Sequence, residues 1–151
     1  MDEMDKKILR LLQGEAGLSI AAISERIGLS HTPCWRRMKR LQSEGYIRGT
    51  VVLLDPAKLG LQVNVIANVK LKAHGEEALE AFEQSVQEYP EIIECFSMSG
   101  ESDYMLRILI ASIEDYEHFL KRVLVHLPGV AAVNSGFALK SVKISTEIPI
   151  I

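Results

Sequence analysis

Apolar side chains recur at helical spacing in the first third of the chain and at strand spacing in most of the remainder. The first stripe, at positions i, i+4, i+7 and i+8, is formed by Met4, Ile8, Leu11 and Leu12. This spacing predicts a helix over residues 2–13. A second helix is predicted over residues 19–27, with Ser19 as its N-cap and Gly28 as its left-handed end.

A third helix is predicted after the short connection Gly28-Leu29. Thr32 can cap it with Pro33 at the first helical position, where the missing N–H removes no hydrogen bond, and it should end at Gly45. Two short helices joined by a tight glycine-bearing turn, with the second rich in Arg and Lys, are typical of a helix-turn-helix.

From Gln62 the apolar positions alternate, which predicts a strand over residues 62–72. Helices are predicted over residues 76–89 and after Ser112, which forms a capping box with Asp115. Further strands are predicted over residues 92–99, 104–111 and 130–139, the last with a candidate extension over 141–145. The order β-α-β-β-α-β is that of a ferredoxin-like antiparallel sheet with both helices on one face.

The predicted sheet also carries apolar side chains on the face without helices, and a second copy of the chain is the simplest cover for it. Residues 46–54 are rich in β-branched side chains and are expected to be extended, until Asp55-Pro56 interrupts them. We therefore predict an α+β protein with three parts. They are a winged helix-turn-helix domain at residues 1–54, a hinge at residues 55–61, and a ferredoxin-like βαββαβ sandwich at residues 62–151.

Charge is distributed unevenly along the 151 residues. The formal net charge is −3, but residues 1–55 hold nine Lys and Arg against seven Asp and Glu, while residues 56–151 hold eight against thirteen. Phosphate responds to the local field within a Debye length of about 10 Å rather than to the net charge. The acidic balance therefore does not exclude nucleic acid as a partner.

Cysteine usage and hydropathy narrow the cellular context. Cys34 and Cys95 form no Cys-x-x-Cys pair, which favours structural thiols in a reducing compartment. No apolar run approaches the roughly 18–20 residues of a membrane span. The acidic N-terminus opens directly into a helical pattern rather than a signal peptide. We expect a cytoplasmic protein with no membrane partner.

Metal and catalytic motifs are lacking in the sequence. His31 and Cys34 are three residues apart, but two ligands cannot complete a tetrahedral site and no second pair has suitable spacing. The chain contains no Gly-x-Ser-x-Gly elbow, no dinucleotide fingerprint and no P-loop. We expect no metal, no cofactor and no enzymatic activity.

The third predicted helix divides into an apolar stripe and a basic face. The stripe holds Cys34, Met38 and Leu41, and the opposite face holds Arg36, Lys39, Arg40 and Ser43. A basic run taken alone is as often a solvated surface as a DNA-binding one. Because this run follows a helix and a tight turn, we favour a helix that enters the major groove of DNA. The predicted DNA-binding residues are Ser30, His31, Thr32, Trp35, Arg36, Arg37, Lys39 and Arg40. Trp35 can either pack on the first helix or touch the sugar-phosphate edge.

Several short motifs follow one another over nearly the whole chain. They are Asp5-x-x-Ile8-Leu9-x-x-Leu12-Gln13, Gly28-Leu29-Ser30-x-Thr32-Pro33-Cys34-x-x-Arg37-x-x-x-Leu41-x-x-x-Gly45-x-Ile47, Asp55-Pro56-x-x-Leu59-Gly60, Gly100-x-x-Asp103-Tyr104 and Leu127-Pro128-Gly129-Val130. In order and spacing they resemble the Lrp/AsnC family of bacterial and archaeal regulators, which includes leucine-responsive and asparagine-responsive proteins.

The resemblance implies a DNA-binding domain, a hinge, and an αβ-sandwich that dimerises through its sheet and often assembles into octamers. It also implies a small effector, usually an amino acid, between dimers near residues 100–104. The effector-binding candidates carried over are Ser99, Gly100, Asp103, Tyr104, Asn134, Ser135 and Gly136. Gly100 leaves backbone N–H groups open to a carboxylate and Asp103 can meet an α-ammonium group. Alternatively, Gly100 serves the turn and Asp103 caps it.

We therefore expect a transcription regulator that binds double-stranded DNA as a homodimer, assembles further to a tetramer or octamer, and senses an amino acid. One alternative is a chromatin-like architectural protein that binds DNA without an effector response. The other is a subunit of an enzyme of amino-acid metabolism, against which the lack of a catalytic constellation argues.

Overall fold

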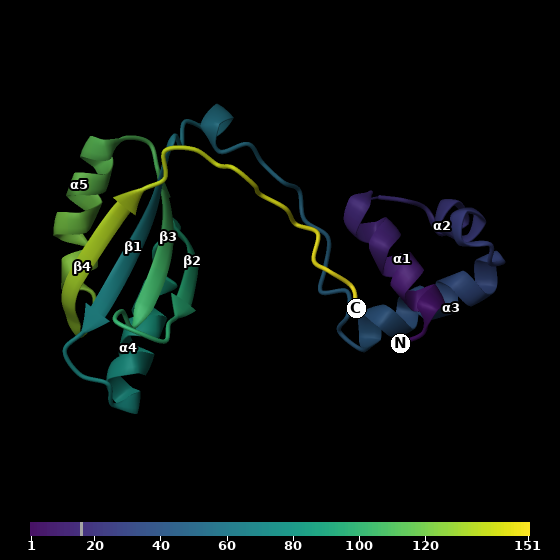
Figure 1. Cartoon of the computed structure of the whole chain (residues 1–151), viewed down its shortest axis with the longest axis horizontal. Coiled ribbons are helices and arrows are strands. Elements are labelled where there is room, and N and C mark those ends of the chain that lie inside the picture. The colour runs from purple at the N-terminus through teal and green to yellow at the C-terminus, as the bar shows by residue number, and fades with distance from the viewer. Residues whose placement is uncertain (16) are drawn as a thin grey trace. The chain divides into compact units, whose positions relative to one another are not determined.

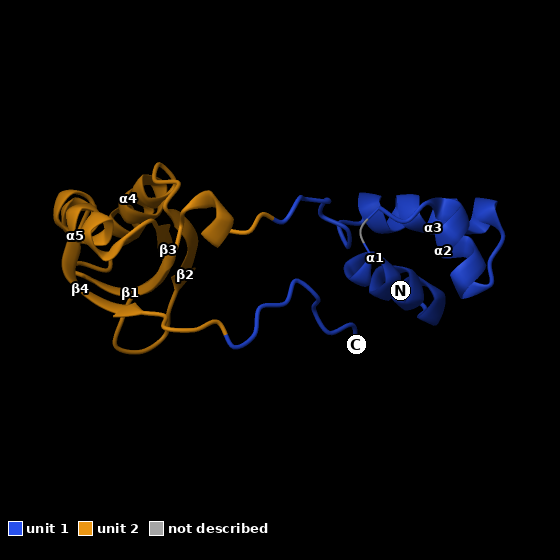
Figure 2. Ribbon diagram, turned by 90° about the horizontal axis from the view of Figure 1, so that it is seen from above, with its two compact units in different colours: residues 1–53, 142–151 blue, residues 54–141 orange. Residues whose placement is uncertain are grey.

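The computed structural model describes residues 1–15 and 17–151, and these form two compact units (Figure 2). The helical unit consists of residues 1–53 and 142–151, and the sheet unit consists of residues 54–141. Each unit has its own hydrophobic core.

Three helices build the helical unit: α1 (Glu3–Gly14), α2 (Ile20–Ile27) and α3 (His31–Ser43) (Figure 1). Their apolar stripes meet in a core whose buried members are Ile8, Ile23, Ile27, Cys34 and Leu41. This arrangement confirms the predicted helix-turn-helix, because α2 and α3 are separated only by the short turn at residues 28–30.

The ends of α2 agree with the sequence pattern, whereas the start of α3 does not. The Ser19 hydroxyl accepts a hydrogen bond from the Ala22 N–H, and Gly28 has a left-handed φ of 71°. The N-cap of α3 is Ser30 and not Thr32. The first helical hydrogen bond runs from the Cys34 N–H to the Ser30 carbonyl, so Pro33 precedes it and interrupts nothing.

The sheet unit has the predicted βαββαβ order. Its elements are β1 (Val63–Leu71), α4 (Glu76–Val86), β2 (Ile92–Ser97), β3 (Tyr104–Ile110), α5 (Ile113–Arg122) and β4 (Val130–Phe137), with short 3₁₀ helices at Ala57–Leu59 and Leu124–His126. The strands are antiparallel in the order β2-β3-β1-β4 (Figure 1). The ferredoxin-like prediction is therefore confirmed.

The two faces of this sheet differ in what covers them. On one face, side chains of β1 and β3 pack against Phe82 of α4 and Phe119 of α5 and form the core of the unit. The opposite face, which we call the open face, carries the alternate side chains Ile66, Met105 and Phe96, and Phe96 is 50% exposed. Of these three side chains only Phe96 is exposed, whereas Ile66 and Met105 are half-buried.

Residues 47–55 and the residues after β4 form neither helix nor strand. Because β4 ends at Phe137, the predicted extension of this strand over residues 141–145 is wrong. The last ten residues, placed with the sandwich by the sequence pattern, belong to the helical unit. The Gln13 side-chain amide accounts for this, because it donates to the Ile148 carbonyl at 3.1 Å and accepts from the Ile148 N–H at 2.8 Å.

Candidate functional site

Helix α3 presents one side to solvent and buries the other. Cys34 and Leu41 are fully buried against α1 and α2. The predicted DNA-binding residues that are exposed, and that take part in no ion pair among the described residues, are Ser30, His31, Thr32, Trp35, Arg36 and Lys39. We call these six residues the outward set. Trp35, whose position the sequence left open, is 44% exposed and lies outside the core of the helical unit.

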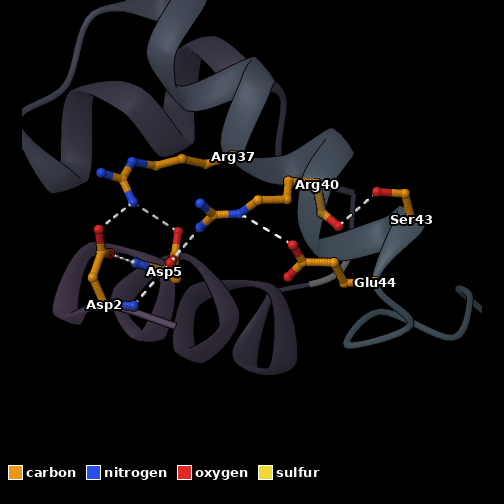
Figure 3. Close-up of polar contacts among 6 residues, drawn as sticks. All are labelled: Asp2, Asp5, Arg37, Arg40, Ser43 and Glu44. Atoms are coloured by element: carbon orange, nitrogen blue, oxygen red, sulfur yellow. Dashed lines mark hydrogen bonds and ion pairs between the residues drawn. The ribbon is translucent and has the colours of Figure 1, made fainter.

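The other two predicted DNA-binding residues, Arg37 and Arg40, extend toward the start of α1 (Figure 3). Arg37 Nη1 lies 2.6 Å from Asp2 Oδ2 and 2.8 Å from Asp5 Oδ1. Arg40 Nη2 lies 2.6 Å from Asp5 Oδ2, and its Nε is 3.9 Å from Glu44 Oε1. We call Asp2, Asp5, Arg37 and Arg40 the Asp5 cluster.

Asp5 is the buried centre of this cluster. Its side chain is 1% exposed, and its Oδ2 also accepts a hydrogen bond from the Asp2 N–H at 2.9 Å. A buried carboxylate is tolerated only where charge partners and hydrogen bonds compensate its lost hydration, and here two guanidinium groups do so. The cluster therefore joins the first turn of α1 to the middle of α3.

Asp2 is exposed, yet its charge is strongly favoured. The hydrogen bond from the Asp5 N–H, followed by the bond from Arg37, lowers the pKa of Asp2 to about 2. The same pairing with Asp2, and then with Asp5, raises the pKa of Arg37. All charges in the Asp2–Arg37 pair are thus present at neutral pH.

Sequence reasoning missed Asp2 and Asp5 as functional candidates, although the pattern contained a signal. Asp5, Ile8 and Leu12 have the spacing i, i+3, i+7, which places the carboxylate on the apolar stripe of α1. A charged residue on a core-facing stripe requires a partner of opposite charge.

The turn between β2 and β3 holds the Gly100 and Asp103 candidates for effector binding. Gly100 has a φ of 117°, a conformation that L side chains rarely adopt. Asp103 Oδ2 accepts the Leu71 N–H at 2.7 Å and its Oδ1 pairs with His74 Nε2 at 2.9 Å. The Leu71 hydrogen bond and the nearby His74 lower the pKa of Asp103. Asp103 is therefore ionised and already fastens the turn to the end of β1.

The remaining effector candidates divide between the two faces of the sheet. Tyr104 is buried on the helix-covered face and donates a hydrogen bond to Glu83 Oε1 at 2.6 Å. Burial first, and then Glu83, raises its pKa. Ser135 is on this face too, and its hydroxyl bonds to that of Tyr116.

Asn134 and Gly136 lie on the open face, where they are opposite Asn68 and Ile66 of β1. Ser99, in the turn before Gly100, is exposed. The structure thus groups Ser99, Gly100 and Asp103 in one turn, but it separates Tyr104 and Ser135 from Asn134 and Gly136.

A small cavity lies beside Tyr104. It has a volume of about 170 Å³ and is lined by Glu83, Gln87, Cys95, Ser97 and Tyr104. Of the predicted effector residues, only Tyr104 lines it. Burial raises the pKa of the Cys95 thiol, and the Glu83 carboxylate adds to this shift.

Within the described residues, no group of three or more His, Cys, Asp and Glu side chains is arranged to hold a metal ion. Nor does any described helix have the length and hydrophobicity to cross a bilayer.

Models of known families match both units. A winged helix-turn-helix DNA-binding domain matches residues 1–48, and the Lrp/AsnC ligand-binding domain matches residues 64–148. The second match alone spans more than half of the chain.

Several characterised regulators are similar over nearly the full length. The DNA-binding transcriptional activator DecR of Escherichia coli (strain K12) is 39% identical over 150 residues, with 99% of each chain covered. The Bkd operon transcriptional regulator of Pseudomonas aeruginosa is 38% identical, with 99% of this chain and 98% of the relative covered.

Solved structures agree with these matches. An AsnC family transcriptional regulator from Agrobacterium tumefaciens superposes with a TM-score of 0.93 at 40% identity, covering 99% of this chain and 97% of that one. A transcriptional regulator from Neisseria meningitidis, solved as a complex with L-Met, has a TM-score of 0.93 at 35% identity, covering 99% and 96%.

Proposed function

Because this chain belongs to the Lrp/AsnC family of transcription regulators, we propose that the outward set of α3 contacts DNA and that an amino acid binds beside the turn at residues 99–103. The protein is a DNA-binding transcription regulator whose activity a small effector modulates. The helical unit is its DNA-binding domain, and the sheet unit is its ligand-binding domain.

The observation that carries the DNA proposal is the division of α3 into a buried and an outward side. Arg36 and Lys39 are exposed and free of ion pairs among the described residues, and Trp35 lies beside them. Arg is well suited to the O6 and N7 acceptors of guanine, and both Arg and Lys neutralise phosphate. In a homodimer, two such helices would enter successive major grooves about 34–36 Å apart.

The open face of the sheet supports the homodimer, since it exposes Phe96 beside Met105 and Ile66. A second sheet would cover these side chains, and further contacts between dimers would give a tetramer or an octamer.

The effector proposal combines the turn with the open face. Ser99, Gly100 and Asp103 provide backbone N–H groups and a carboxylate, and Asn134 and Gly136 face the side where a second copy would pack. An α-carboxylate and an α-ammonium group of an amino acid match these donors and acceptors. Tyr104 and Ser135 lie on the helix-covered face and have a structural role in this proposal. Tyr104, next to the turn, bonds to Glu83 of α4, and Ser135 of β4 bonds to Tyr116 of α5.

Replacing Arg36 with Gln tests the DNA contact. We expect weaker binding and a slope of log K against log salt that is smaller by about 0.9, because one phosphate contact releases that share of counterions. Binding would be measured by fluorescence anisotropy over a salt series, with a duplex that the wild-type protein selects from a random-sequence pool. Lys121→Gln, which removes an equal charge from α5, is the matched control. Equal slopes for Arg36→Gln and Lys121→Gln would contradict the proposed interface.

A thermal-shift panel of the twenty amino acids tests the effector, with L-Met and the aliphatic amino acids tried first. A ligand at one hundred times its dissociation constant should add about 2.7 kcal/mol of stability. We expect Asn134→Ala to abolish the shift and Asn64→Ala to retain it, because Asn64 is a half-buried residue at the opposite end of β1 from Asn68, the residue that Asn134 faces. The absence of a shift with every amino acid would favour the architectural alternative.

A further inference from the structure

We infer that Asp5 is a positioning residue for DNA binding: it holds Arg37 against α1 and thereby fixes the rotation of α3 that turns Arg36 and Lys39 outward. This inference rests on the proposed role of the outward set. It assigns Arg37, a half-buried basic residue of α3, to contacts with α1 rather than with the duplex.

The first argument is the complete use of the Asp5 carboxylate. Its Oδ1 receives Arg37 at 2.8 Å, and its Oδ2 receives Arg40 at 2.6 Å and the Asp2 N–H at 2.9 Å. The Asp5 side chain is 1% exposed, so these partners, and not water, compensate its charge in the folded protein. Withdrawal of Arg37 to a phosphate would leave a buried charge with one guanidinium group fewer, which is strongly unfavourable.

Arg37 and Arg40 differ in how firmly they are held. Arg37 bridges two carboxylates, whereas Arg40 makes one close ion pair with Asp5 (Figure 3). The Arg37 side chain is 28% exposed and the Arg40 side chain 47%. A phosphate can therefore approach Arg40 while it stays bonded to Asp5. We therefore assign Arg40 both to the contact with phosphate and to the positioning of α3, and Arg37 to the positioning of α3 alone.

The helical geometry transmits this anchoring to the outward set. Arg37 and Arg40 are three residues apart and share one side of α3, and Arg36 and Lys39 have the same spacing one position earlier, on a neighbouring side. Because successive residues are about 100° apart, fixing Arg37 fixes the direction of Arg36. The Asp2 N-cap bond to the Asp5 N–H in turn fixes the carboxylates at the start of α1.

Salt dependence separates a positioning residue from a contact residue. The probes are the selected duplex described above and poly(dI-dC) as non-specific DNA, at a temperature where circular dichroism shows every variant folded. We expect Arg37→Gln to keep the wild-type salt slope but to lower the ratio of specific to non-specific affinity several-fold. Arg36→Gln, as the contact control, should lower the slope by about 0.9.

Asp5→Asn and Asp2→Asn complete the test. Asp5→Asn should lower the specificity ratio without lowering the slope, because both arginines keep their charge while Arg37 loses the buried one of its two carboxylate partners. If Asp5→Asn does not fold, Asp2→Asn removes the other carboxylate that holds Arg37 and should lower the specificity ratio in the same way, since Asp2 is 55% exposed and its loss leaves no buried charge unpaired. A variant with reduced melting temperature and an unchanged specificity ratio would show a purely structural role and overturn the inference.

The outcomes also distinguish this inference from the proposed function. If Arg37→Gln lowers the slope as much as Arg36→Gln, Arg37 contacts phosphate and only the positioning role fails. If Arg36→Gln and Lys39→Gln leave both slope and affinity unchanged, the interface on α3 itself is wrong and the positioning role fails with it.

Discussion

Asp2 and Asp5 have the same side chain and lie one helical turn apart, yet the first is 55% exposed and the second 1%. Asp2 caps the first turn of α1, and Asp5 reaches across to α3. The difference follows from position, because Asp5 shares the stripe of Ile8 whereas Asp2 precedes the helix. One carboxylate therefore closes a helix end, and the other connects two helices.

The lowered pKa of Asp2 predicts an acid-dependent loss of stability in the helical unit. A carboxyl group whose folded pKa is about 2, against an ordinary value of 3.8, stabilises the folded state above the ordinary pKa. This contribution declines as the pH falls from about 4 toward about 2. Urea denaturation followed by circular dichroism between pH 7 and pH 2.5 measures the decline.

Asp2→Asn should show a smaller fall in the free energy of unfolding over this pH range than the wild type. Glu76→Gln, an exposed acidic residue in the first turn of α4, is the control and should follow the wild-type curve. A wild-type curve and an Asp2→Asn curve that run parallel would refute the assigned cause of the pKa shift.

At the level of elements, periodicity was sufficient to predict the type and order of the α-helices and strands among the described residues, but not the two short 3₁₀ helices. The apolar stripe of α1 at i, i+4 and i+7 identifies a helix, and the alternation of apolar and polar residues in β1 identifies a strand. In each case one side of the element is buried, so apolar residues recur with the period of that element. The ends were less predictable. Ser30 and Thr32 are both good caps, and the choice between them depends on where α3 packs, which local sequence does not encode.

The candidate site was predicted less completely than the fold. A helical wheel separates the apolar side of α3 from its polar side, and so it finds Arg36 and Lys39. It does not show that a carboxylate on α1 faces Arg37, because that contact joins residues 32 positions apart. The division of the effector candidates between two faces also depends on strand register, as the pairing of Asn134 with Asn68 shows.

At the scale of the whole molecule, the open face predicts self-association. Phe96→Asp places a charge on the exposed apolar part of that face and should shift the protein toward the monomer, because an unpaired charge in an apolar interface is costly. Analytical ultracentrifugation measures the change. The same variant should lose the thermal shift with the effector if the binding site includes the partner.

Val125→Asp is the control for this experiment, since Val125 is 47% exposed but belongs to the 3₁₀ helix after α5 rather than to the open face. A Phe96→Asp variant with the sedimentation coefficient of the wild type would show that another surface carries the assembly.

The polypeptide passes between its two units twice, first through the segment after α3 and again after β4, before Gln13 pairs with the backbone of Ile148. The ligand-binding domain is thus tethered to its DNA-binding domain at both of its ends. A rearrangement of the ligand-binding domain would therefore act on the helical unit through two chain connections, and the second of them ends on α1, the helix that also supplies Asp5.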